Sequence, residues 1–349
     1  MKKNAIVITN GCPENRVDCA ETEQFLFKNG WKIIPEANQA DLIILNLCGL
    51  LNKTEKNSLE LIKLANEKKK KNAKLVVTGC LPIINNDSIM HVFKGDIIKG
   101  HNIKKTSDLL GIKNNPNDIS ANYLIPNNLL RIRNKSTIQS KIKNRFDLYY
   151  ILNRFHFPQY RKYWEQINIV QPNTFYIKIA TGCVHTCSYC AVKRSRGSVK
   201  SKRVDAIKTE FIKGLKSGYT QFALVGTDLG SYGADIQTDL PVLLRELVSI
   251  DGKYEIKLRN VHPQLLINKL SEFLSIAETN KITHITTAIQ HGNDRMLGLM
   301  KRSYKIKDCT LAIGALKASC PTLKIRAQLM VGFPGETHSE FNDTLKLID

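Results

Sequence analysis

The sequence predicts an α/β protein with two domains, each built on a parallel sheet, and three observations support this prediction. The chain has 349 residues, which suits two domains because single hydrophobic cores stop growing near ~250–300 residues. Short apolar runs alternate with helix-like stretches over roughly the first 110 residues, and the alternation resumes near Asn173. A basic and aromatic stretch separates the two series. We therefore expect domains at 1–111 and 173–349, joined by a linker or helical insertion at 112–172.

The first domain has the strand–helix alternation of an α/β fold. Its short apolar runs, such as DLIILNL at 41–47, are typical of buried strands. We expect strands at 5–9, 31–35, 41–47 and 74–78, and helices at 18–28 and 54–67. The four lysines at 68–71 follow the second helix, where we expect a solvated helix end.

The second domain repeats the alternation at spacings that suit βα units. We expect strands at 174–180, 221–225, 255–261, 284–290 and 323–331, and helices at 204–217, 240–250, 263–276, 308–319 and from about 337. Such a series predicts a parallel sheet or barrel. Because the chain stops in the helix after the fifth strand, the expected barrel is incomplete.

The stretch at 112–172 differs from both domains. It opens with a loop-like segment and continues with basic and aromatic side chains. Basic residues interleaved with stacking aromatics suit RNA, so an RNA or ribosome contact is one hypothesis. A packed helical insertion is the alternative. The basic residues that would carry an RNA contact include Arg131, Arg133, Lys141 and Lys143.

The formal net charge of +21 favours contact with a polyanion, most simply RNA or a ribosomal particle. The alternative is a lysine-rich surface without a specific partner. The first residues lack the apolar run of ~7–15 residues that a signal peptide needs, and no run approaches the ~20 residues of a membrane span. We therefore expect a cytoplasmic protein without a membrane contact. In that compartment thiols stay reduced, so the nine cysteines are interpreted as metal ligands and buried thiols rather than disulfides.

Three of these cysteines, Cys183, Cys187 and Cys190, form a CxxxCxxC motif directly after the first strand of the second domain. Thiolates hold iron–sulfur clusters, and three protein ligands would leave one iron open, as catalytic metal sites keep an open position. An open iron can chelate the amino and carboxylate groups of S-adenosylmethionine. Zinc is the alternative, but zinc sites usually take four protein ligands. Tyr189, just before the last cysteine, would shield the cluster and its ligand, whereas His185 is expected to be a loop residue.

A second set of cysteines occupies matching places in the first domain. Cys12, Cys48 and Cys80 each follow an expected strand. Loops after parallel strands share one edge of a sheet, where α/β proteins bind ligands, so the three thiols should meet in space. Gly11 and Gly79 precede two of them and would allow a bulky ligand close to the backbone. The alternative is three unrelated buried thiols, which is how we interpret the remaining three, Cys19, Cys309 and Cys320.

Taken together, these motifs resemble the radical S-adenosylmethionine methylthiotransferases. The resemblance runs from about residue 5 to the end of the chain, apart from 112–172. Within that family, several stretches are most similar to the ribosomal-protein aspartate methylthiotransferases. These are GCPENRVD at 11–18, NLCGL at 46–50, TGCL at 78–81, KIATGC at 178–183, GTD at 226–228, SYG at 231–233, IQHGND at 289–294 and VGFPGET at 331–337.

The resemblance implies a specific activity. A [4Fe–4S] cluster on Cys183, Cys187 and Cys190 would cleave S-adenosylmethionine, and an auxiliary [4Fe–4S] cluster on the other three cysteines would carry or present sulfur. Two S-adenosylmethionine molecules would be used per turnover, with electrons from an external donor such as flavodoxin. The implied product is a methylthio group on the β-carbon of an aspartate in a small-subunit ribosomal protein. A radical is needed because an unactivated C–H bond has no acidic proton for a base to remove.

Two alternatives remain open at this stage. One is the same chemistry on a modified adenosine of tRNA, and the other is a non-catalytic iron–sulfur or RNA-binding module. The implied partners are a ribosomal protein or ribosome, or tRNA, together with a reductant and a sulfur donor, and we expect a monomer. The chain ends before a sixth barrel strand and before the C-terminal RNA-binding β-domain usual in the family. It is therefore expected to be a fragment or to work with a partner.

The ends of the expected strands also suggest contacts to S-adenosylmethionine. Gly226 and Asp228 would hold its methionine amino group or ribose, and Gln290 would face the ribose. Gly332 and Gly335 would let the adenine approach the backbone. An ordinary turn at these two glycines is the alternative.

Overall fold

A computed structural model describes residues 3–113 and 174–348, which fall into two compact units that divide between Pro172 and Asn173. We call them unit 1 and unit 2 and describe each by itself. The expected insertion at 112–172, with its basic residues Arg131, Arg133, Lys141 and Lys143, lies outside the described residues apart from its first two positions. Within the described part of the chain, no helix is both long and apolar enough to cross a membrane.

Unit 1 is a five-stranded parallel sheet with the strand order β2-β1-β3-β4-β5. The strands are β1 (Asn4–Thr9), β2 (Lys32–Ile33), β3 (Leu42–Leu47), β4 (Lys74–Gly79) and β5 (Asp96–Ile97). The helices are α1 (Pro13–Lys28), η1 (Ala37–Gln39), α2 (Asn52–Lys68), α3 (Leu81–Ile84), α4 (Asn86–Met90) and α5 (Ile103–Leu110). Strand order reverses between β1 and β3, and α/β sheets bind ligands at the carboxyl ends of strands flanking such a switch point.

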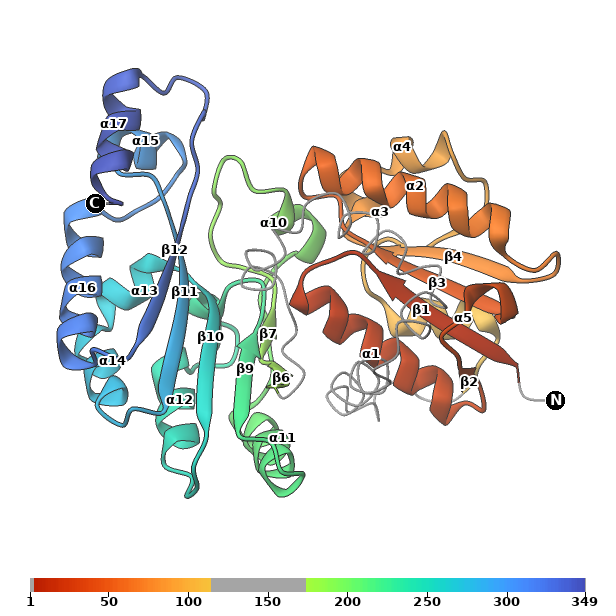
Figure 1. The fold of residues 1–349 in the computed structure, drawn as a ribbon, viewed down its shortest axis with the longest axis horizontal. Helices are drawn as coiled ribbons and strands as arrows, with labels where there is room; N and C mark the ends of the chain where they lie inside the picture. The colour runs from red at the N-terminus through yellow and green to blue at the C-terminus, as the bar shows by residue number, and fades with distance from the viewer. Residues whose placement is uncertain (1–2, 114–173, 349) are drawn as a thin grey trace, which may run out of the picture. The chain divides into compact units, whose positions relative to one another are not determined.

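Helices cover both faces of this sheet (Figure 1). Phe25 and Leu26 of α1 pack on alternate residues of β3 and β4, together with α5. Leu61 and Ile62 of α2 pack on the other set of alternate residues. Side chains of a strand point alternately to its two faces, so a fully apolar strand such as β3 supplies both layers. This arrangement confirms the α/β class with a parallel N-terminal sheet.

Helix α1 begins at Pro13, five residues before the start that we expected at residue 18. Proline is well suited to the first helical turn, because its fixed φ fits the helix and its missing N–H would have no partner there. Cys12 is the residue that precedes the helix, with an extended backbone. Because the helix begins at Pro13, Cys12 lies at the turn between β1 and α1 rather than in a long loop.

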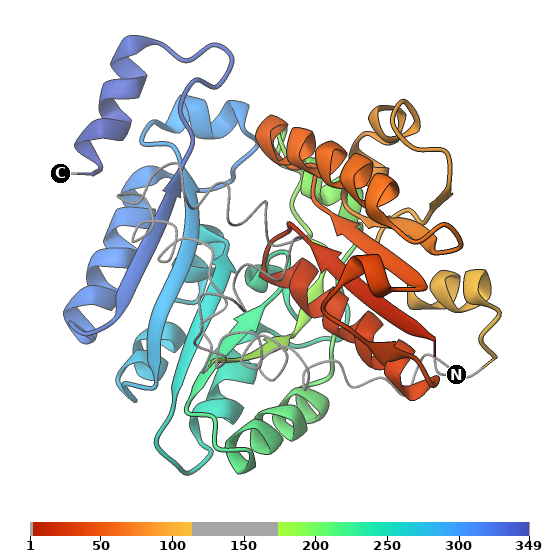
Figure 2. The same ribbon diagram turned by 45° about the vertical axis from the view of Figure 1, so that its right-hand side comes forward.

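Unit 2 is a second parallel sheet, with the sequential order β6-β9-β10-β11-β12 (Figure 2). The strands are β6 (Thr174–Lys178), β9 (Gln221–Val225), β10 (Glu255–Val261), β11 (Ile282–Gln290) and β12 (Lys324–Leu329). The helices that follow them are α11 (Val204–Lys216), η5 (Leu229–Ser231), α12 (Leu240–Val248), α13 (Pro263–Asn268), α14 (Leu270–Ala277), α15 (Asp294–Leu299), α16 (Ile306–Ser319) and α17 (His338–Lys346). All five strands that we expected are present, as a partial (βα) barrel requires.

The core of unit 2 lies between the sheet and one layer of helices. Phe211 of α11, Leu244 of α12 and Phe273 of α14 pack there on strand residues such as Phe222 and Leu258. Residues on the opposite face of the strands are less apolar, so the inner side of the partial barrel is left for polar and charged groups.

Besides α15, which was not expected, three features of unit 2 differ from expectation. The helix expected at 263–276 is two helices, because Lys269 leaves the helical conformation with φ −121° and ion-pairs with Asp239 and Glu272. A two-stranded antiparallel sheet joins β7 (Ala180–Thr181) to β8 (Lys200–Ser201). The short helix α10 (Ala191–Arg196) begins directly after Cys190. These last two elements close the cysteine loop at its base, and they were too short to recognise from periodicity.

Candidate functional site

The cysteine loop of unit 2, residues 182–190, begins at a glycine where any side chain would be strained. Gly182 has φ +85°, and a side chain there would collide with the backbone of Ser198. Its N–H donates to Thr227 Oγ1 at 3.0 Å, on the loop after β9. The first cysteine is therefore fixed by a left-handed backbone and by the neighbouring strand end.

Cys183 is half-buried against two side chains of the loop after β9. Its thiol lies 3.7 Å from Asp228 Oδ2, and its sulfur accepts from Ser231 Oγ at 3.6 Å and from the His185 N–H at 3.4 Å. Burial, and then the negative charge of Asp228, raise the pKa of the Cys183 thiol. Without a metal this cysteine is held as a thiol, so ligating iron would release its proton.

Asp228 organises this side of the loop. Its Oδ1 accepts from the N–H groups of Gly230 at 2.9 Å and His262 at 3.1 Å, and its Oδ2 accepts from Ser231 Oγ at 2.6 Å. His185 Nε2 lies 3.5 Å from the same Oδ2, and the His185 ring stacks on His262 with centroids 3.7 Å apart. Several bonds of this carboxylate are therefore made within the protein, so it holds the loop. Its expected contact to S-adenosylmethionine stays a prediction.

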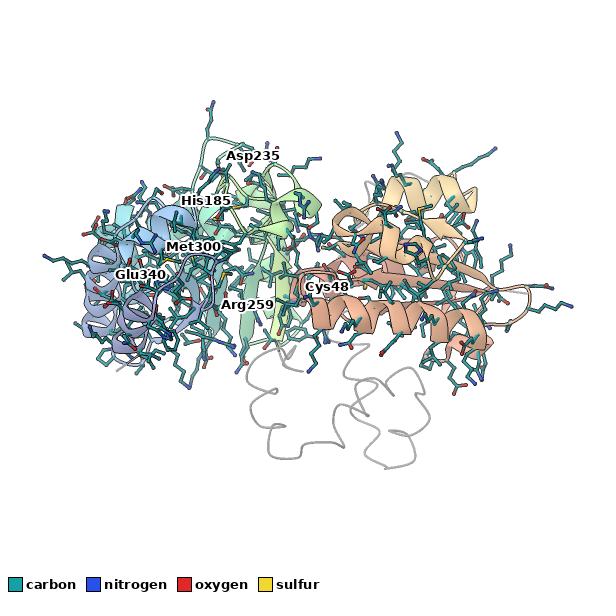
Figure 3. All side chains as sticks on the ribbon, turned by 90° about the horizontal axis from the view of Figure 1, so that it is seen from above. Cys48, His185, Asp235, Arg259, Met300 and Glu340 are labelled. Carbon is teal, nitrogen blue, oxygen red and sulfur yellow. The ribbon has the colours of Figure 1, made fainter. Side chains whose placement is uncertain are left out.

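The other end of the loop is bound to the end of α15. The Ser188 N–H donates to the Met300 carbonyl at 3.2 Å, and Ser188 Oγ donates to the Leu299 carbonyl at 2.9 Å. Tyr189 receives a hydrogen bond from Arg302 Nη2 at 2.6 Å. Figure 3 labels Met300 and His185, which mark these two sides of the loop. Cys187 and Cys190 thus lie in a loop whose two ends are both attached to unit 2.

The glycine loop after β12 reaches the cysteine loop through aromatic rings. Phe333, between Gly332 and Gly335, contacts Tyr189 edge-on with centroids 6.3 Å apart. Glu336 accepts from the N–H groups of Gly332 and Phe333. Both glycines have a positive φ, +73° and +84°, and a side chain on either would meet nothing within 4 Å. The open space beside both glycines agrees with the predicted approach of an adenine.

Gln290 ends β11 with φ +72°, and the Met330 N–H donates to its carbonyl at 2.6 Å. The adjacent His291 is fully buried, and its Nε2 lies 2.9 Å from Glu336 Oε1. His291 therefore acts on the glycine loop through Glu336. Gly226 lies at the end of β9, where a side chain would come within 2.9 Å of the Ala180 carbonyl. Gly226 thus serves close packing of two strand ends, and its contact to the cofactor remains a prediction.

The three thiols of this loop fit a cluster with one open iron. Cys183, Cys187 and Cys190 are all partly exposed, and all carry free thiols. Cys183 Sγ, His185 Nε2 and an Asp228 oxygen also lie within 4.8 Å of one another, a spacing that could hold a single metal ion. That alternative set would leave two of the three thiols unused and would compete with the hydrogen bonds of Asp228. The full cysteine motif therefore favours the cluster, with His185 outside it.

In unit 1 the three cysteines follow the neighbouring strands β1, β3 and β4. Cys48 comes directly after β3 and Cys80 directly after β4, where Leu47 is in register with Gly79. The thiols of Cys12 and Cys80 approach the same atom, Asn15 Oδ1, at 3.9 and 3.8 Å. The carboxyl edge of the sheet thus brings together thiols that are far apart in the sequence. Figure 3 labels Cys48 at this edge.

Side-chain amides hold this edge together. Asn10 Oδ1 accepts from the Cys48 N–H at 3.1 Å, Asn10 Nδ2 donates to Ser58 Oγ at 2.8 Å, and Ser58 Oγ donates to the Cys48 carbonyl at 2.7 Å. Gly79 has φ +99°, and a side chain on it would lie 2.6 Å from Asn46 Oδ1 and from the backbone of Leu47. Gly79 therefore allows the close approach of two strand ends. Its expected role in letting a ligand approach the backbone stays a prediction.

Asn46, two residues before Cys48, is 1% exposed. Neither of its side-chain polar atoms has a hydrogen-bond partner in the described part of the chain. A buried amide without partners costs folding free energy, so this orphaned group is consistent with a bound ligand at the edge. The three thiols and this amide fit the predicted auxiliary cluster.

Sequence reasoning did not single out Asn10, Asn46, Ser231, His262 or Arg302, which position the two sites. Asn10, Asn46 and His262 stand directly after or at the end of strands, which was the available signal. Arg302 lies after a short helix that we did not anticipate, so no pattern identified it. Cys19, Cys309 and Cys320 are buried thiols.

Two family models match this chain, one on residues of each unit. Residues 4–100 match the family described as uncharacterized protein family UPF0004, and residues 177–348 match the radical SAM superfamily. Among solved structures, the radical methyltransferase TsrM of Kitasatospora setae superimposes with a TM-score of 0.64 at 12% identity, covering 100% of this chain and 73% of that one. The cobalamin-dependent radical enzyme OxsB superimposes with a TM-score of 0.62 at 11% identity, and this chain spans 51% of it. These likenesses show the fold.

Two relatives match almost the whole chain. The ribosomal protein uS12 methylthiotransferase RimO of Syntrophomonas wolfei is 28% identical over 346 residues, which cover 98% of this chain and 72% of that protein. The threonylcarbamoyladenosine tRNA methylthiotransferase MtaB of Thermotoga maritima is 26% identical over 348 residues, 99% of this chain and 72% of that protein. The two family models lie on residues of both units, and relatives named as methylthiotransferases match almost the whole chain. The chain belongs to the radical S-adenosylmethionine methylthiotransferases, a family of transferases.

Proposed function

We propose that this protein inserts a methylthio group at an unactivated C–H bond, most simply the β-carbon of an aspartate in a small-subunit ribosomal protein. The observation that carries the proposal is the presence of two three-cysteine sites, one on each unit. Cys183, Cys187 and Cys190 would hold the cluster that binds S-adenosylmethionine. Cys12, Cys48 and Cys80 would hold an auxiliary [4Fe–4S] cluster, and this second site distinguishes a sulfur-inserting enzyme from other radical enzymes.

The residues of unit 2 have separate tasks in this proposal. A bound [4Fe–4S] cluster with an open iron supplies chelation of S-adenosylmethionine and the electron that cleaves its C–S bond. Asp228 and Ser231 hold Cys183 on one side, and the end of α15 holds Ser188 on the other. Tyr189, in edge contact with Phe333, would shield the cluster and its ligand, and Gly332 and Gly335 would let the adenine approach the backbone.

The overall reaction converts a substrate C–H bond into C–S–CH₃. The methyl group comes from one S-adenosylmethionine, and the hydrogen leaves with the 5′-deoxyadenosine made from a second. The sulfur reaches the substrate through the auxiliary site, from a sulfur donor. Electrons come from an external reductant such as flavodoxin.

Methylthiolation of a modified adenosine in tRNA is the second candidate, because MtaB of Thermotoga maritima, named as a tRNA methylthiotransferase, matches as much of the chain as the ribosomal-protein enzyme. The charge of the partial barrel suits either anionic substrate. Lys257 and Arg259 alternate with the core residues of β10, and Lys324 of β12 is near Lys257. Burial first, and then the charges of Lys324 and Arg259, lower the pKa of Lys257. A positive inner face attracts a carboxylate or a phosphate alike.

Anaerobic reconstitution tests the enzyme class. Two [4Fe–4S] clusters predict about eight irons per chain, and added reductant should release 5′-deoxyadenosine from S-adenosylmethionine. His185→Asn should leave the iron content unchanged, since His185 is not a cluster ligand in this proposal. A chain that takes up iron but never cleaves S-adenosylmethionine would instead be a non-catalytic iron–sulfur module. Loss of iron in the His185 variant would favour the single-metal site with Cys183 and Asp228.

Mass spectrometry of a deletion strain identifies the substrate. Ribosomal proteins and digested tRNA from the mutant and its parent are compared for the loss of a methylthio group. Loss from a small-subunit ribosomal protein supports the leading candidate, and loss from a tRNA adenosine supports the second.

A further inference from the structure

Arg302 is a partly buried cation whose charge is not balanced by a carboxylate in the described part of the chain. It forms no ion pair there, and its Nε and Nη1 atoms are buried without a hydrogen-bond partner. Nη2 donates to Tyr189 OH at 2.6 Å, and the guanidinium carbon lies 6.0 and 5.9 Å from the ring centroids of Tyr189 and Tyr304. Buried charges are costly unless they are paired, so a cation in this position calls for a counter-charge.

The backbone that carries Arg302 is held in an unusual conformation. Lys301 has φ +56°, a left-handed conformation that costs a non-glycine residue about 1–2 kcal/mol. The Lys301 N–H donates to the Gly298 carbonyl at 2.9 Å, and the Arg302 N–H donates to the Leu297 carbonyl at 2.8 Å. This pair of bonds is the Schellman ending of α15. Strain of this kind persists only where the surroundings hold it, and it gathers at functional sites.

The same helix end binds the cysteine loop. The carbonyls of Leu299 and Met300 are among the last of α15 and have no partner within the helix. They accept instead from Ser188, so the loop segment between Cys187 and Cys190 sits directly on the turn that presents Arg302. Tyr304 fixes the other side of the turn, because its OH donates to the Ile289 carbonyl of β11 at 2.6 Å. Arg302 is therefore clamped between two tyrosines beside the thiols.

The carboxylate of this site faces the opposite side of the loop. Asp228 contacts Cys183 and His185, and not Arg302. The remaining negative charge beside Arg302 is that of the cysteines once they ligate iron as thiolates. A cluster held by three thiolates gains one more negative charge when it is reduced. A fixed, partly buried cation beside it stabilises the reduced form by more than the oxidised form.

We propose that Arg302 is the counter-ion of the unit 2 cluster, positioned by the Schellman turn and by Tyr189 so that its charge and its two free donors raise the reduction potential. Arg302 is a positioning residue in this proposal, since it acts on the ease of electron transfer and does not contact the substrate. The inference rests on the proposed cluster at Cys183, Cys187 and Cys190. It goes beyond that proposal because a ligand set alone leaves the potential of a cluster open.

The test is a redox titration followed by electron paramagnetic resonance. It uses the full chain with Cys12, Cys48 and Cys80 replaced by alanine, so that only the unit 2 cluster is observed. At a fixed potential near the midpoint of this parent, Arg302→Gln should lower the ratio of reduced to oxidised cluster at least ten-fold, which is ~59 mV for one electron. The ratio should fall less in Arg302→Lys, which keeps the positive charge. Lys301→Gln removes a neighbouring exposed charge from the same turn and should leave the ratio unchanged.

The outcomes separate this inference from the proposed function. A parent chain that binds no cluster contradicts the proposed function. A parent cluster whose potential is unchanged in Arg302→Gln overturns the role of Arg302 alone. If Arg302→Gln takes up no iron, the iron content of Arg302→Lys is measured instead. Iron uptake by Arg302→Lys supports the counter-ion role. Failure of Arg302→Lys to take up iron overturns the proposal. An equal shift in Lys301→Gln would also overturn it, because the effect would then be general surface charge.

Discussion

The two cysteine sites reach similar ligand sets by opposite routes. In unit 1 the ligands come from three loops and meet only because β1, β3 and β4 are neighbours in register. In unit 2 they come from one loop of eight residues, which distant side chains must hold in place. The first site therefore depends on the fold itself, whereas the second depends on a few contacts from η5 and α15.

The surroundings of the two sites also differ in chemistry. In unit 1, Asn15 lies beside the thiols of Cys12 and Cys80, and Asn10 binds the backbone of Cys48. Such amides stay neutral at every pH. Asp228, His262 and Arg302 stand around the loop of unit 2, and all three carry or can carry charge. If the two sites act as proposed, charged side chains lie beside the cluster that accepts an electron, and amides lie beside the one that presents sulfur.

One device is common to both. Gly79 and Gly182 each precede a cysteine directly, each has a positive φ, and a side chain on either would strike backbone atoms of a neighbouring segment. Both sites thus need a glycine where the chain leaves a strand, directly before a cysteine. The routes differ, but the local turn that delivers the thiol is the same.

Removing a single ligand should have the largest effect and should separate the two sites. Cys187→Ala should abolish the release of 5′-deoxyadenosine, and Cys48→Ala should leave that release intact while abolishing methylthio insertion. Each variant should lose about four irons, the content of one [4Fe–4S] cluster. Iron analysis and product chromatography measure the outcome. If Cys48→Ala stopped the release of 5′-deoxyadenosine as well, the two sites could not be treated as independent.

Alanine at the shared glycines comes next in magnitude. Gly79→Ala should lower the free energy of unfolding by about 3–5 kcal/mol, because the unfavourable φ adds to contacts at 2.6 Å with Asn46 and Leu47. Gly30→Ala is the matched control in unit 1, since Gly30 has φ +84° and open space, and should cost only about 1–2 kcal/mol. Chemical denaturation measures both variants.

The same pair of changes can be made in unit 2. Gly182→Ala should be as costly as Gly79→Ala, with Gly197→Ala as its control, because Gly197 has φ +71° and a side chain on it would meet no atom within 4 Å. Gly182→Ala should remove the unit 2 cluster alone, and Gly79→Ala the unit 1 cluster alone. Equal costs for Gly182→Ala and Gly197→Ala would mean that φ, and not the collision, sets the requirement.

A smaller effect is expected where side-chain bonds join the loops of unit 1. Asn10→Ala removes the acceptor of the Cys48 N–H and the donor to Ser58, and should cost about 1–3 kcal/mol. Ser58→Ala removes the next bond of the same network. A double-mutant cycle should give a coupling of at least 0.5 kcal/mol. Strict additivity would show that the two side chains hold the Cys48 loop independently.

Much of the fold could be predicted because its information is local. The apolar run at 41–47 and the cysteine spacing at 183–190 are patterns within ten residues, and each led directly to β3 and to the unit 2 loop. A rule about strand ends predicted the place of Cys12, Cys48 and Cys80 after neighbouring strands. The missed elements include α10, α15 and the β7–β8 pair, which are too short to show a period, and β5 with the short helices α3, α4 and α5 of unit 1. Arg302 and Asn10 act through partners far away in the sequence, and a single sequence carries no signal for such contacts.

The smallest expected effect concerns pH, and it should be confined to unit 2. Burial first, and then the charges of His185 and Arg302, lower the pKa of His262 from 6.5 to about 2. Below pH 6.5 the unfolded chain binds a proton that the folded unit does not bind until about pH 2, so stability is complete above pH 6.5 and falls on acidification. The slope should be roughly 1.4 kcal/mol per pH unit.

His262→Asn tests this origin of acid sensitivity. Asparagine keeps an acceptor for the Gln264 N–H at the start of α13, which His262 Nδ1 now provides at 3.2 Å, but it cannot be protonated. Urea denaturation of iron-free protein at pH 7.5 and pH 5.5 should therefore show a smaller acid loss in the variant, by about 1.4 kcal/mol. An identical loss in both proteins would place the acid sensitivity elsewhere. The contrast between a titratable site in unit 2 and a neutral one in unit 1 would then have no counterpart in stability.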